Sequence, residues 1–340
     1  MYLDPTRTGI PPLGRTKILF TSSLDTPFIN EDFRLLSAKC DVDRLTTRGI
    51  LAPFRILPRI LAVDLSYTWF ASTYAFWAVT LAKMFGKPAL VVVGGVDAAK
   101  IPEIGYGLWR SPWRSALVRR ALRNATRVLV VAPNLKKRLI ELARYAGENI
   151  AWVPTGYDGT YWYPEGVKER LVLTVAACED VPRLRAKGID FLVRCALQMP
   201  DTRFVVAGVH ERALRQAMLP EALNVRVLPY GSQEELRRLY QVARVYCLPS
   251  LTEGMPNSLC EAMLCGCVPV ATDVGGVPEV LGDVGFRVRY GDVEGMVRAL
   301  GGALDAPRED ASRARLRIAE IFPLERRERE LMRAVAEALP

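Results

Sequence analysis

Short apolar runs rich in β-branched residues alternate along this chain with longer amphipathic runs, and this change of period limits the possible folds more than any other feature. The alternation is typical of a parallel sheet whose strands are joined by helical crossovers. It occurs on both sides of residues 154–166, a stretch dense in Gly, Pro and aromatic residues that we interpret as a linker. We therefore predict an α/β protein with two Rossmann-like, doubly wound domains facing each other across a cleft.

The expected elements follow from the period of each run. In the first half, strands are expected at residues 17–20, 61–65, 89–93 and 127–131, with helices at 71–84 and 134–146. In the second half, strands are expected at residues 171–176, 203–207, 225–228, 245–248, 268–271 and 285–288, with a helix at 233–243. Ligands of such sheets bind at the carboxyl ends of the strands, so the cleft between the domains is the expected site.

Length and cysteine usage agree with this plan. The 340 residues, half of them hydrophobic, exceed what one core usually organises. The seven cysteines are odd in number and mostly lie in apolar runs, which predicts reduced, buried thiols. Cys265 and Cys267 are the only close pair, and no second pair or nearby histidine completes a zinc site, so no metal is expected.

Residues 1–12 do not resemble a signal peptide, and we expect a cytoplasmic protein.

The net charge of +9 comes mostly from arginine, which suits phosphate and anionic surfaces. A nucleic-acid partner would explain the charge, but the sequence has no zinc-finger spacing, no basic region with heptads and no RNP-like run. A compositional bias of the source would produce the same excess of arginine, so no nucleic-acid partner is expected. Residues 66–82 form the longest stretch without a formal charge, and their serine and threonine content favours a buried helix over a membrane span.

The strongest chemical signal follows the fourth predicted strand of the second half. Residues 249–263 form a short loop rich in Gly and Pro that leads into a helix starting near Asn257 or Ser258. Free N–H groups at such a helix start form an anion site that favours a phosphate without a metal. Gly254 lets the backbone approach a ligand closely, and Pro256 stiffens the loop before the helix.

Two glutamates bracket this loop. Glu253 can accept hydrogen bonds from sugar hydroxyls, and Glu261, one helical turn further in, can accept them from a ribose diol. Glu261 has an alternative role, because Ser258 and Glu261 also match an S-x-x-E capping box that closes the helix start. Glu253 has no such structural explanation, although a loop glutamate is often only solvated.

The spacing of Glu253 and Glu261 resembles the E-x7-E segment of the retaining GT-B glycosyltransferases of family 4, also called group 1. The resemblance extends in order over most of residues 150–300. It is carried further by residues 153–158, 228–231, 235–240, 248–250, 266–270, 275–279 and 291–292. The first 150 residues resemble the family's acceptor domain only loosely.

The resemblance implies a metal-independent hexosyltransferase that takes a sugar from a UDP-, GDP- or ADP-sugar with retention of configuration, and it implies no cofactor. Residues 1–165, with a C-terminal helix at 322–340 packing back on them, would bind the acceptor, and residues 166–321 would bind the donor. Glu253 would touch the transferred sugar and Glu261 the ribose. The rest of the donor site would comprise Tyr230, Gly254, Met255, Pro256, Asn257, Ser258 and Leu259.

The family also places an arginine and a lysine on the diphosphate. Lys187 matches the lysine position, but the usual Gly-Arg after the strand is Ala176-Ala177 here. Arg183 or Arg185 must supply the second charge, or it is missing, and we favour Arg183. Fixed cations and helix-start amides can stabilise the charge that develops on the leaving phosphate without magnesium.

The mechanism that the resemblance implies needs no enzymic base, because in a front-face transfer the departing phosphate takes the proton of the acceptor. The sequence agrees with this, since its sole histidine is His210, for which a capping or surface role is expected. Because the chain has no second histidine, a Ser-His or Cys-His triad would lack its usual base, and a histidine-based zinc site would lack its usual ligands.

In the first half, Gly94, Gly95 and Asp97 directly follow the predicted strand at 89–93 and are the best candidates for an acceptor or sugar site. Two glycines permit close approach of a ligand, and Asp97 could bind hydroxyl groups. The alternative is a tight turn with a helix-capping aspartate. Weaker candidates of the same kind follow the first strand: Asp25, Phe28 and Asp32.

Residues 109–123 combine Trp109 and Trp113 with five arginines, which would suit docking on anionic lipid headgroups at the inner face of the membrane. An ordinary basic surface helix is the alternative. In the first case the acceptor is expected to be lipid-linked, and in the second a glycolipid, an oligosaccharide and a polysaccharide all remain open as acceptors.

Two other classes of protein remain open. The altered arginine position leaves room for a catalytically inactive subunit that only binds sugar nucleotides. A nucleotide-sugar epimerase or hydrolase of GT-B architecture is disfavoured, because such enzymes lack the E-x7-E loop.

Overall fold

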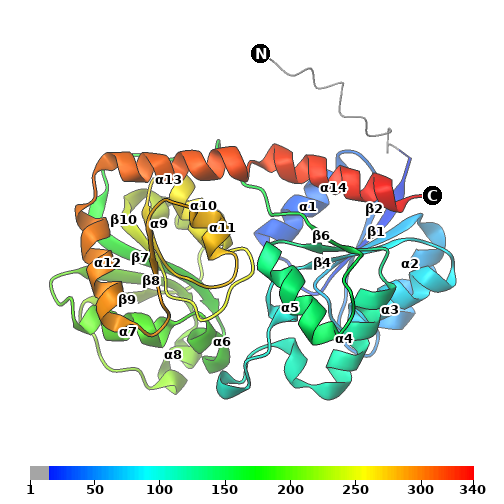
Figure 1. Ribbon diagram of the computed structural model, residues 1–340, viewed down its shortest axis with the longest axis horizontal. Helices are drawn as coiled ribbons and strands as arrows, with labels where there is room; N and C mark the ends of the chain where they lie inside the picture. Colours follow the sequence, from blue (N-terminus) through cyan, green and yellow to red (C-terminus); the bar gives the residue numbers. More distant parts are fainter. Residues whose placement is uncertain (1–14) are drawn as a thin grey trace, which may run out of the picture. The chain divides into compact units, whose positions relative to one another are not determined.

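The computed structural model describes residues 15–340, which form two compact α/β units (Figure 1). The first unit contains residues 15–100, 107–155 and 325–340, and the second contains Ile101–Tyr106 and Gly156–Leu324. The chain therefore changes unit after Thr155 and after Leu324, whereas the sequence analysis placed these changes after residues 165 and 321. The short segment Ile101–Tyr106 belongs to the second unit although the residues on either side of it belong to the first, and the sequence does not predict this.

The first unit is built on a parallel sheet with the strand order β2-β1-β3-β4-β5-β6. Its strands are β1 (Lys17–Ser22), β2 (Asp41–Thr46), β3 (Leu65–Trp69), β4 (Ala89–Val93), β5 (Arg127–Val130) and β6 (Ile150–Trp152). Its helices are α1 (Pro27–Ser37), α2 (Ala52–Ala62), α3 (Thr73–Met84), α4 (Pro112–Asn124), α5 (Pro133–Ala143) and α14 (Leu324–Ala338), with the 3-10 turns η2 (Val96–Ala98) and η4 (Leu108–Arg110). The strand order reverses between β1 and β3, and sheets of this kind bind ligands beside such a reversal.

The strand predicted at residues 61–65 is wrong, because α2 continues to Ala62 and β3 begins only at Leu65. Apolar residues lie on both the buried and the exposed face of α2, so the helical period is hidden in this run. The charge-free residues 66–82 form β3 and most of α3 rather than a single helix. No helix within residues 15–340 combines the length and apolar composition needed to cross a bilayer.

The second unit also contains a parallel sheet, with the strand order β12-β11-β10-β7-β8-β9. Its strands are β7 (Glu169–Cys178), β8 (Arg203–Val209), β9 (Val225–Leu228), β10 (Ala243–Leu248), β11 (Val268–Thr272) and β12 (Phe286–Val288). Its helices are α6 (Val181–Ala186), α7 (Ile189–Leu197), α8 (Glu211–Ala217), α9 (Gln233–Val242), α10 (Asn257–Leu264), α11 (Val277–Leu281), α12 (Val293–Asp305) and α13 (Arg308–Ile321), with the turn η3 (Pro102–Ile104). Here the order reverses between β7 and β10.

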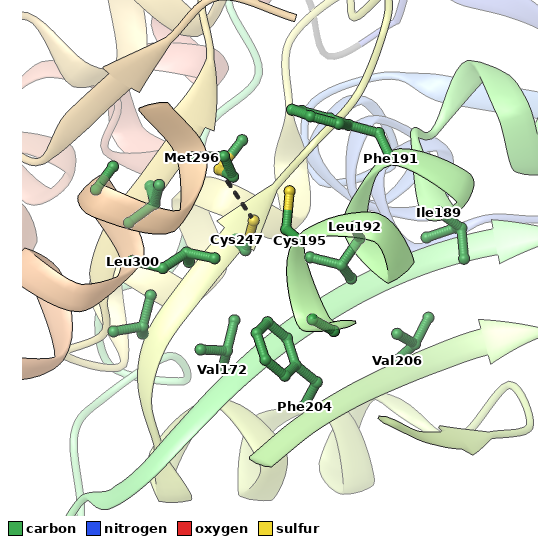
Figure 2. Packing of buried hydrophobic residues seen from close by; sticks show 14 of the residues in the cluster. Val172, Ile189, Phe191, Leu192, Cys195, Phe204, Val206, Cys247, Met296 and Leu300 are labelled. Atoms are coloured by element: carbon green, nitrogen blue, oxygen red, sulfur yellow. Dashed lines mark hydrogen bonds between the residues drawn. The ribbon is translucent and has the colours of Figure 1, made fainter. Parts of the chain in front are cut away.

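The core of the second unit lies between its sheet and the helices α7 and α12 (Figure 2). Phe191 and Cys195 of α7, Cys247 of β10 and Met296 of α12 are fully buried, and the sulfur atoms of Cys247 and Met296 lie 3.8 Å apart. All seven cysteines of the chain are buried free thiols, as the sequence analysis predicts. This packing holds β7 and β10 side by side.

The C-terminal helix α14 packs within the first unit through a buried ion pair. Arg327 donates to Asp32 of α1 from Nε at 2.8 Å and from a terminal nitrogen at 2.6 Å. The same carboxylate accepts hydrogen bonds from the Tyr67 hydroxyl at 2.7 Å and from Trp69 Nε1 at 2.8 Å. Asp32 was a weak candidate for a ligand site, and this is corrected here, because its carboxylate is buried and occupied by core partners.

Candidate active site

The loops that follow β7 and β10 meet where the strand order of the second sheet reverses. After β7 the chain forms α6, Lys187 and Gly188, and after β10 it forms the loop at residues 249–256. The backbone N–H of Leu251 donates to the carbonyl of Ala186 at 2.9 Å, which ties the two loops together. Ligands of doubly wound sheets bind at this position.

Lys187 and Glu253 form an ion pair at this point. Lys187 Nζ donates to Glu253 Oε1 at 2.6 Å, and the Ser250 hydroxyl donates to the same oxygen, also at 2.6 Å. Burial by itself lowers the pKa of Lys187, but the Glu253 carboxylate outweighs this and raises it, so the ammonium is charged. Glu253 Oε2 has no hydrogen-bond partner within residues 15–340, and this oxygen is available to a ligand.

Two glycines with left-handed backbone let the surrounding chain approach this pair. Gly188 has φ +67°, and a Cβ there would overlap the carbonyl oxygen of Pro249. Gly275 has φ +60°, and a Cβ there would overlap the carbonyl oxygen of Glu253. The loop is held further by Gly276, whose N–H donates to the carbonyl of Gly254 at 2.9 Å. Both glycines fix the backbone that carries Glu253.

Helix α10 begins at Asn257 with no side-chain cap. The Ser258 hydroxyl contacts the Tyr246 hydroxyl at 2.7 Å, and the Asn257 amide oxygen accepts from the Tyr157 hydroxyl at 2.7 Å. The capping-box role that the sequence left open for Glu261 is therefore absent. Since no side-chain cap occupies this helix start among residues 15–340, its positive end is suited to an anion.

Glu261 lies beside two tyrosines. The Tyr240 hydroxyl donates to Glu261 Oε2 at 3.1 Å, and burial raises the pKa of Glu261 to about 7 in spite of this hydrogen bond. Burial raises the pKa of Tyr230, and the Glu261 charge raises it further, so the two side chains lie within electrostatic reach. Tyr230 itself is 61% exposed.

The geometry distinguishes between Arg183 and Arg185. Arg183 is half-buried and Arg185 is exposed. Burial raises the pKa of the Cys178 thiol to about 12, while the positive charges of Lys187 and Arg183 act in the opposite direction. Cys178 is the last residue of β7, so Arg183 lies on the same side of the strand end as Lys187. Arg183 has no hydrogen bond or ion pair from its side chain to any residue among 15–340.

His210 caps α8, where its Nδ1 accepts from the backbone N–H of Arg212 at 3.2 Å. This is the capping role that the sequence analysis favours. No group of three or more His, Cys, Asp or Glu side chains in the described part of the chain is arranged to hold a metal ion.

In the first unit, the structure selects the turn interpretation of residues 94–97. Asp97 is fully buried, and its carboxylate accepts hydrogen bonds from the backbone N–H groups of Gly94, Gly95 and Ala71 at 2.8 to 3.4 Å. Burial raises the pKa of Asp97 to about 6, and these N–H groups oppose the shift. The prediction that Asp97 contacts hydroxyl groups of a ligand is therefore corrected: Asp97 shapes the loop, and Gly94 and Gly95 remain partly exposed.

Sequence analysis missed Phe70, which directly follows β3. Phe70 has φ +66°, a conformation that costs a non-glycine residue free energy and often marks functional loops. Its ring lies 6.3 Å from that of Phe28, and a Cβ at Gly94 would approach it to 2.7 Å. Phe28, Phe70 and Gly94 thus gather at the carboxyl edge of the first sheet. No sequence signal predicts this, because only the folded chain shows a positive φ at Phe70.

In the basic segment at residues 109–123, some side chains contact the rest of the first unit and others are exposed. Trp109 is buried and its Nε1 donates to the carbonyl of Asp97, while Arg119 and Arg123 donate to carbonyls at the end of α5. These three side chains therefore contact the rest of the first unit, which favours the interpretation as an ordinary basic helix. Among the tryptophans and arginines of the segment, the exposed ones are Arg110, Trp113, Arg114, Arg120 and Arg123.

Two doubly wound units, with a lysine, a glutamate and an uncapped helix start at the strand reversal of the second, have the architecture of the GT-B class. The family model described as "Glycosyltransferase Family 4" matches residues 18–160, and the model described as "Glycosyl transferases group 1" matches residues 170–306. The chain belongs to this family, the group 1 or family 4 glycosyltransferases.

Relatives and solved structures agree with this assignment. The chain is 28% identical over 228 residues to the MMP alpha-(1->4)-mannosyltransferase of Mycolicibacterium hassiacum, covering 61% of this chain and 54% of that protein. It is 26% identical over 281 residues to the alpha-maltose-1-phosphate synthase of Mycolicibacterium smegmatis, covering 74% and 70%. The chain thus spans about half the length of the first of these relatives. The structure of Anabaena HepE in complex with UDP and glucose has the same fold, with a TM-score of 0.78 at 15% identity over 94% of this chain and 99% of that one.

Proposed function

We propose that this protein transfers a sugar from a nucleoside-diphosphate sugar to an acceptor, without a metal ion and with retention of configuration. The observation that carries the proposal is the Lys187–Glu253 pair at the strand reversal, next to the uncapped start of α10. A cation, a carboxylate with one free oxygen and a row of backbone N–H groups together match the diphosphate and sugar of such a donor.

Each group has a role that follows from its chemistry. Lys187, Arg183 and the N–H groups of α10 would stabilise the negative charge that develops on the leaving phosphate. Glu253 would accept hydrogen bonds from the hydroxyl groups of the transferred sugar. Glu261, once ionised, would accept them from the ribose, with Tyr230 beside it. The departing phosphate would take the proton of the acceptor, so no enzymic base is required.

For the acceptor, we propose a carbohydrate or lipid-linked carbohydrate bound at the carboxyl edge of the first sheet. Partly exposed Gly94 and Gly95 permit close approach there, and the rings of Phe28 and Phe70 offer an apolar surface for a sugar ring. The names of the relatives state different compounds, from alpha-maltose-1-phosphate to phosphatidylinositol and D-inositol 3-phosphate, so the acceptor is best sought by screening.

The experiment that tests the proposal is a thermal-shift panel of UDP-, GDP- and ADP-sugars without added metal. We expect one nucleotide series to raise the Tm, with a sugar-dependent part of the shift that Glu253→Ala weakens. Glu221→Ala is the matched control, since Glu221 is an exposed glutamate of the same unit outside the site. The absence of any shift, with or without EDTA, would contradict donor binding.

A catalytically inactive donor-binding subunit is the second candidate, and the missing Gly-Arg motif at Ala176-Ala177 favours it. Transfer of a labelled sugar to acceptors of a cell extract separates the two. Product with an anomeric configuration equal to that of the donor, read by proton NMR, supports a retaining enzyme. Donor binding without any product supports the inactive subunit.

A further inference from the structure

Exposed apolar side chains are concentrated on one part of the first unit. Most exposed large hydrophobic residues of a protein are scattered singly and need no explanation, whereas a contiguous group marks an interaction surface. Within residues 50–85 the exposed large hydrophobic residues are Ile50, Leu51, Phe54, Leu57, Leu61, Trp77, Met84 and Phe85. We call this group the α2–α3 patch.

Helix α2 contributes a continuous apolar stripe to the patch. Phe54, Leu57 and Leu61 follow a helical spacing that places them on one face, and Ile50 lies just before the helix; Ile50 and Phe54 are 87% and 74% exposed. The opposite face carries Ala52, Ile56 and Ile60, which are fully buried in the core. A helix that is apolar on both faces needs a partner on its outer side.

The end of helix α3 extends this stripe. Helices α2 and α3 pack against each other in the first unit (Figure 1). Lys87, just after α3, donates to the carbonyls of Ile60, Leu61 and Val63, which fixes the end of α3 beside the end of α2. Met84, directly before this junction, is 70% exposed.

The charges within residues 48–87 are almost all positive, although Arg59 of α2 pairs with Asp43 of β2 at 2.6 Å. Residues 48–87 contain five lysines and arginines but one acidic residue, Asp64, which accepts a hydrogen bond from the backbone N–H of Lys17. Arg48 and Arg55 are exposed, and neither side chain has a hydrogen bond or ion pair with any residue in the described part of the chain. Long arginine side chains beside an apolar stripe can reach headgroup phosphates while the stripe enters the acyl region.

We propose that the α2–α3 patch docks the protein on a bilayer surface that contains anionic lipids. The combination of apolar stripe and cationic border matches such a surface in both its apolar and its charged layers. A second copy of the chain is a poorer occupant, because a symmetric contact would bring the cationic borders of the two copies together without acidic residues to offset them. Residues 109–123 are a poorer docking surface, since the fold uses Trp109, Arg119 and Arg123 internally.

The test is co-sedimentation of the full-length chain with vesicles of phosphatidylcholine alone or with phosphatidylglycerol. We expect binding to the anionic vesicles only, and weaker binding at high salt. Phe54→Gln combined with Leu61→Gln should lower the affinity at least about tenfold, because both side chains are exposed and leave the apolar stripe. Met218→Gln combined with Leu223→Gln is the matched control, as these residues are 87% and 94% exposed on the second unit, and it should bind like the wild type.

A second pair of variants tests the charged border. Arg48→Gln combined with Arg55→Gln should lower the affinity roughly tenfold or more and reduce its salt dependence. Arg110→Gln combined with Arg114→Gln, in the alternative segment, should have little effect.

Three outcomes would overturn the proposal. The first is no binding of the wild type to anionic vesicles, and the second is binding that survives Phe54→Gln with Leu61→Gln. The third is self-association of the wild type that these two changes abolish while vesicles compete poorly, which would identify a second copy as the partner. The thermal shift by nucleotide sugars should be the same in all variants, so a failure here is distinct from a failure of the proposed transferase function.

Discussion

At the scale of single residues, this site depends on which polar side chains the fold leaves available. Glu253 keeps one carboxylate oxygen free, whereas the carboxylates of Asp32 and Asp97 are fully used by core partners. Glu261 is held by one tyrosine only and is otherwise desolvated. Its protonation state is therefore adjustable, which gives the donor site a pH dependence.

The affinity for an intact nucleotide sugar should rise with pH. Burial raises the pKa of Glu261 to about 7, so the empty site is mostly protonated near pH 6 and ionised near pH 8. Only the carboxylate accepts both ribose hydroxyls, so we expect the affinity to increase about tenfold over this range. Calorimetric titration across the range measures this, and the intact donor is used because its diphosphate does not titrate there.

The control for this pH effect is Glu261→Gln, which should bind more weakly near pH 8 and show a flat profile. The raised pKa of Glu261 also makes the stability of the folded protein depend on pH. Because the folded pKa lies above the unfolded value, the stabilising contribution of protonated Glu261 is lost as the pH rises through about 7. An affinity of the wild type that falls with rising pH would contradict the assigned role.

Arg183→Ala should lower the rate of sugar transfer or donor hydrolysis about a hundredfold, because a fixed charge on the leaving phosphate is lost. Arg185→Ala is the matched control on the same helix and should change the rate only slightly, since this side chain is exposed. Equal effects of the two changes would show that neither arginine is the family's second diphosphate cation.

At the scale of elements, the site is formed by close contacts between loops rather than by helix caps. Helix α9 begins with a complete capping box from Ser232 and Glu235, whereas α10 begins with none. The uncapped positive end of α10 is thus suited to an anionic ligand. The loop before α10 is positioned by glycines, because Gly188 and Gly275 allow backbone to lie where a side chain would collide.

Gly188→Ala should be considerably more destabilising than Gly166→Ala. The two residues have nearly equal φ angles, +67° and +71°, but a Cβ at Gly188 would overlap Pro249, while a Cβ at Gly166 meets nothing within 4 Å. We expect a cost of about 1–2 kcal/mol for Gly166→Ala and about 3 kcal/mol or more for Gly188→Ala. Urea unfolding of both variants measures the difference, and equal costs would mean that the loop after β10 adjusts freely.

At the scale of the whole molecule, the first unit is built from parts that lie far apart in the sequence. Arg327 and Asp32 are separated by 295 positions, and Arg327 also donates to the carbonyls of Val153 and Pro154, just before the chain enters the second unit. Helix α14 therefore completes the core of the first unit and holds the end of its last segment.

Arg327→Ala should destabilise the first unit by about 3–5 kcal/mol, because it leaves the Asp32 carboxylate buried without its partner. Arg333→Ala, which removes an exposed ion pair on the same helix, should leave the unfolding midpoint unchanged. In a double-mutant cycle, Arg327→Ala with Asp32→Ala should cost less than the sum of the single changes. Strict additivity would contradict a direct ion pair.

The sequence by itself determined the two doubly wound units, most of their strands and the loop with Glu253 and Glu261, because period and short spacings are local properties. It also missed α2 as a helix, since apolar residues on both faces hide the period. Only the tertiary structure decided that Arg183 is half-buried while Arg185 is exposed, that Glu261 is not a cap, and that Asp97 and Asp32 are structural. The physical reason is that the use of a polar side chain depends on partners brought together by folding, often from distant segments, and these contacts leave no pattern in the local sequence.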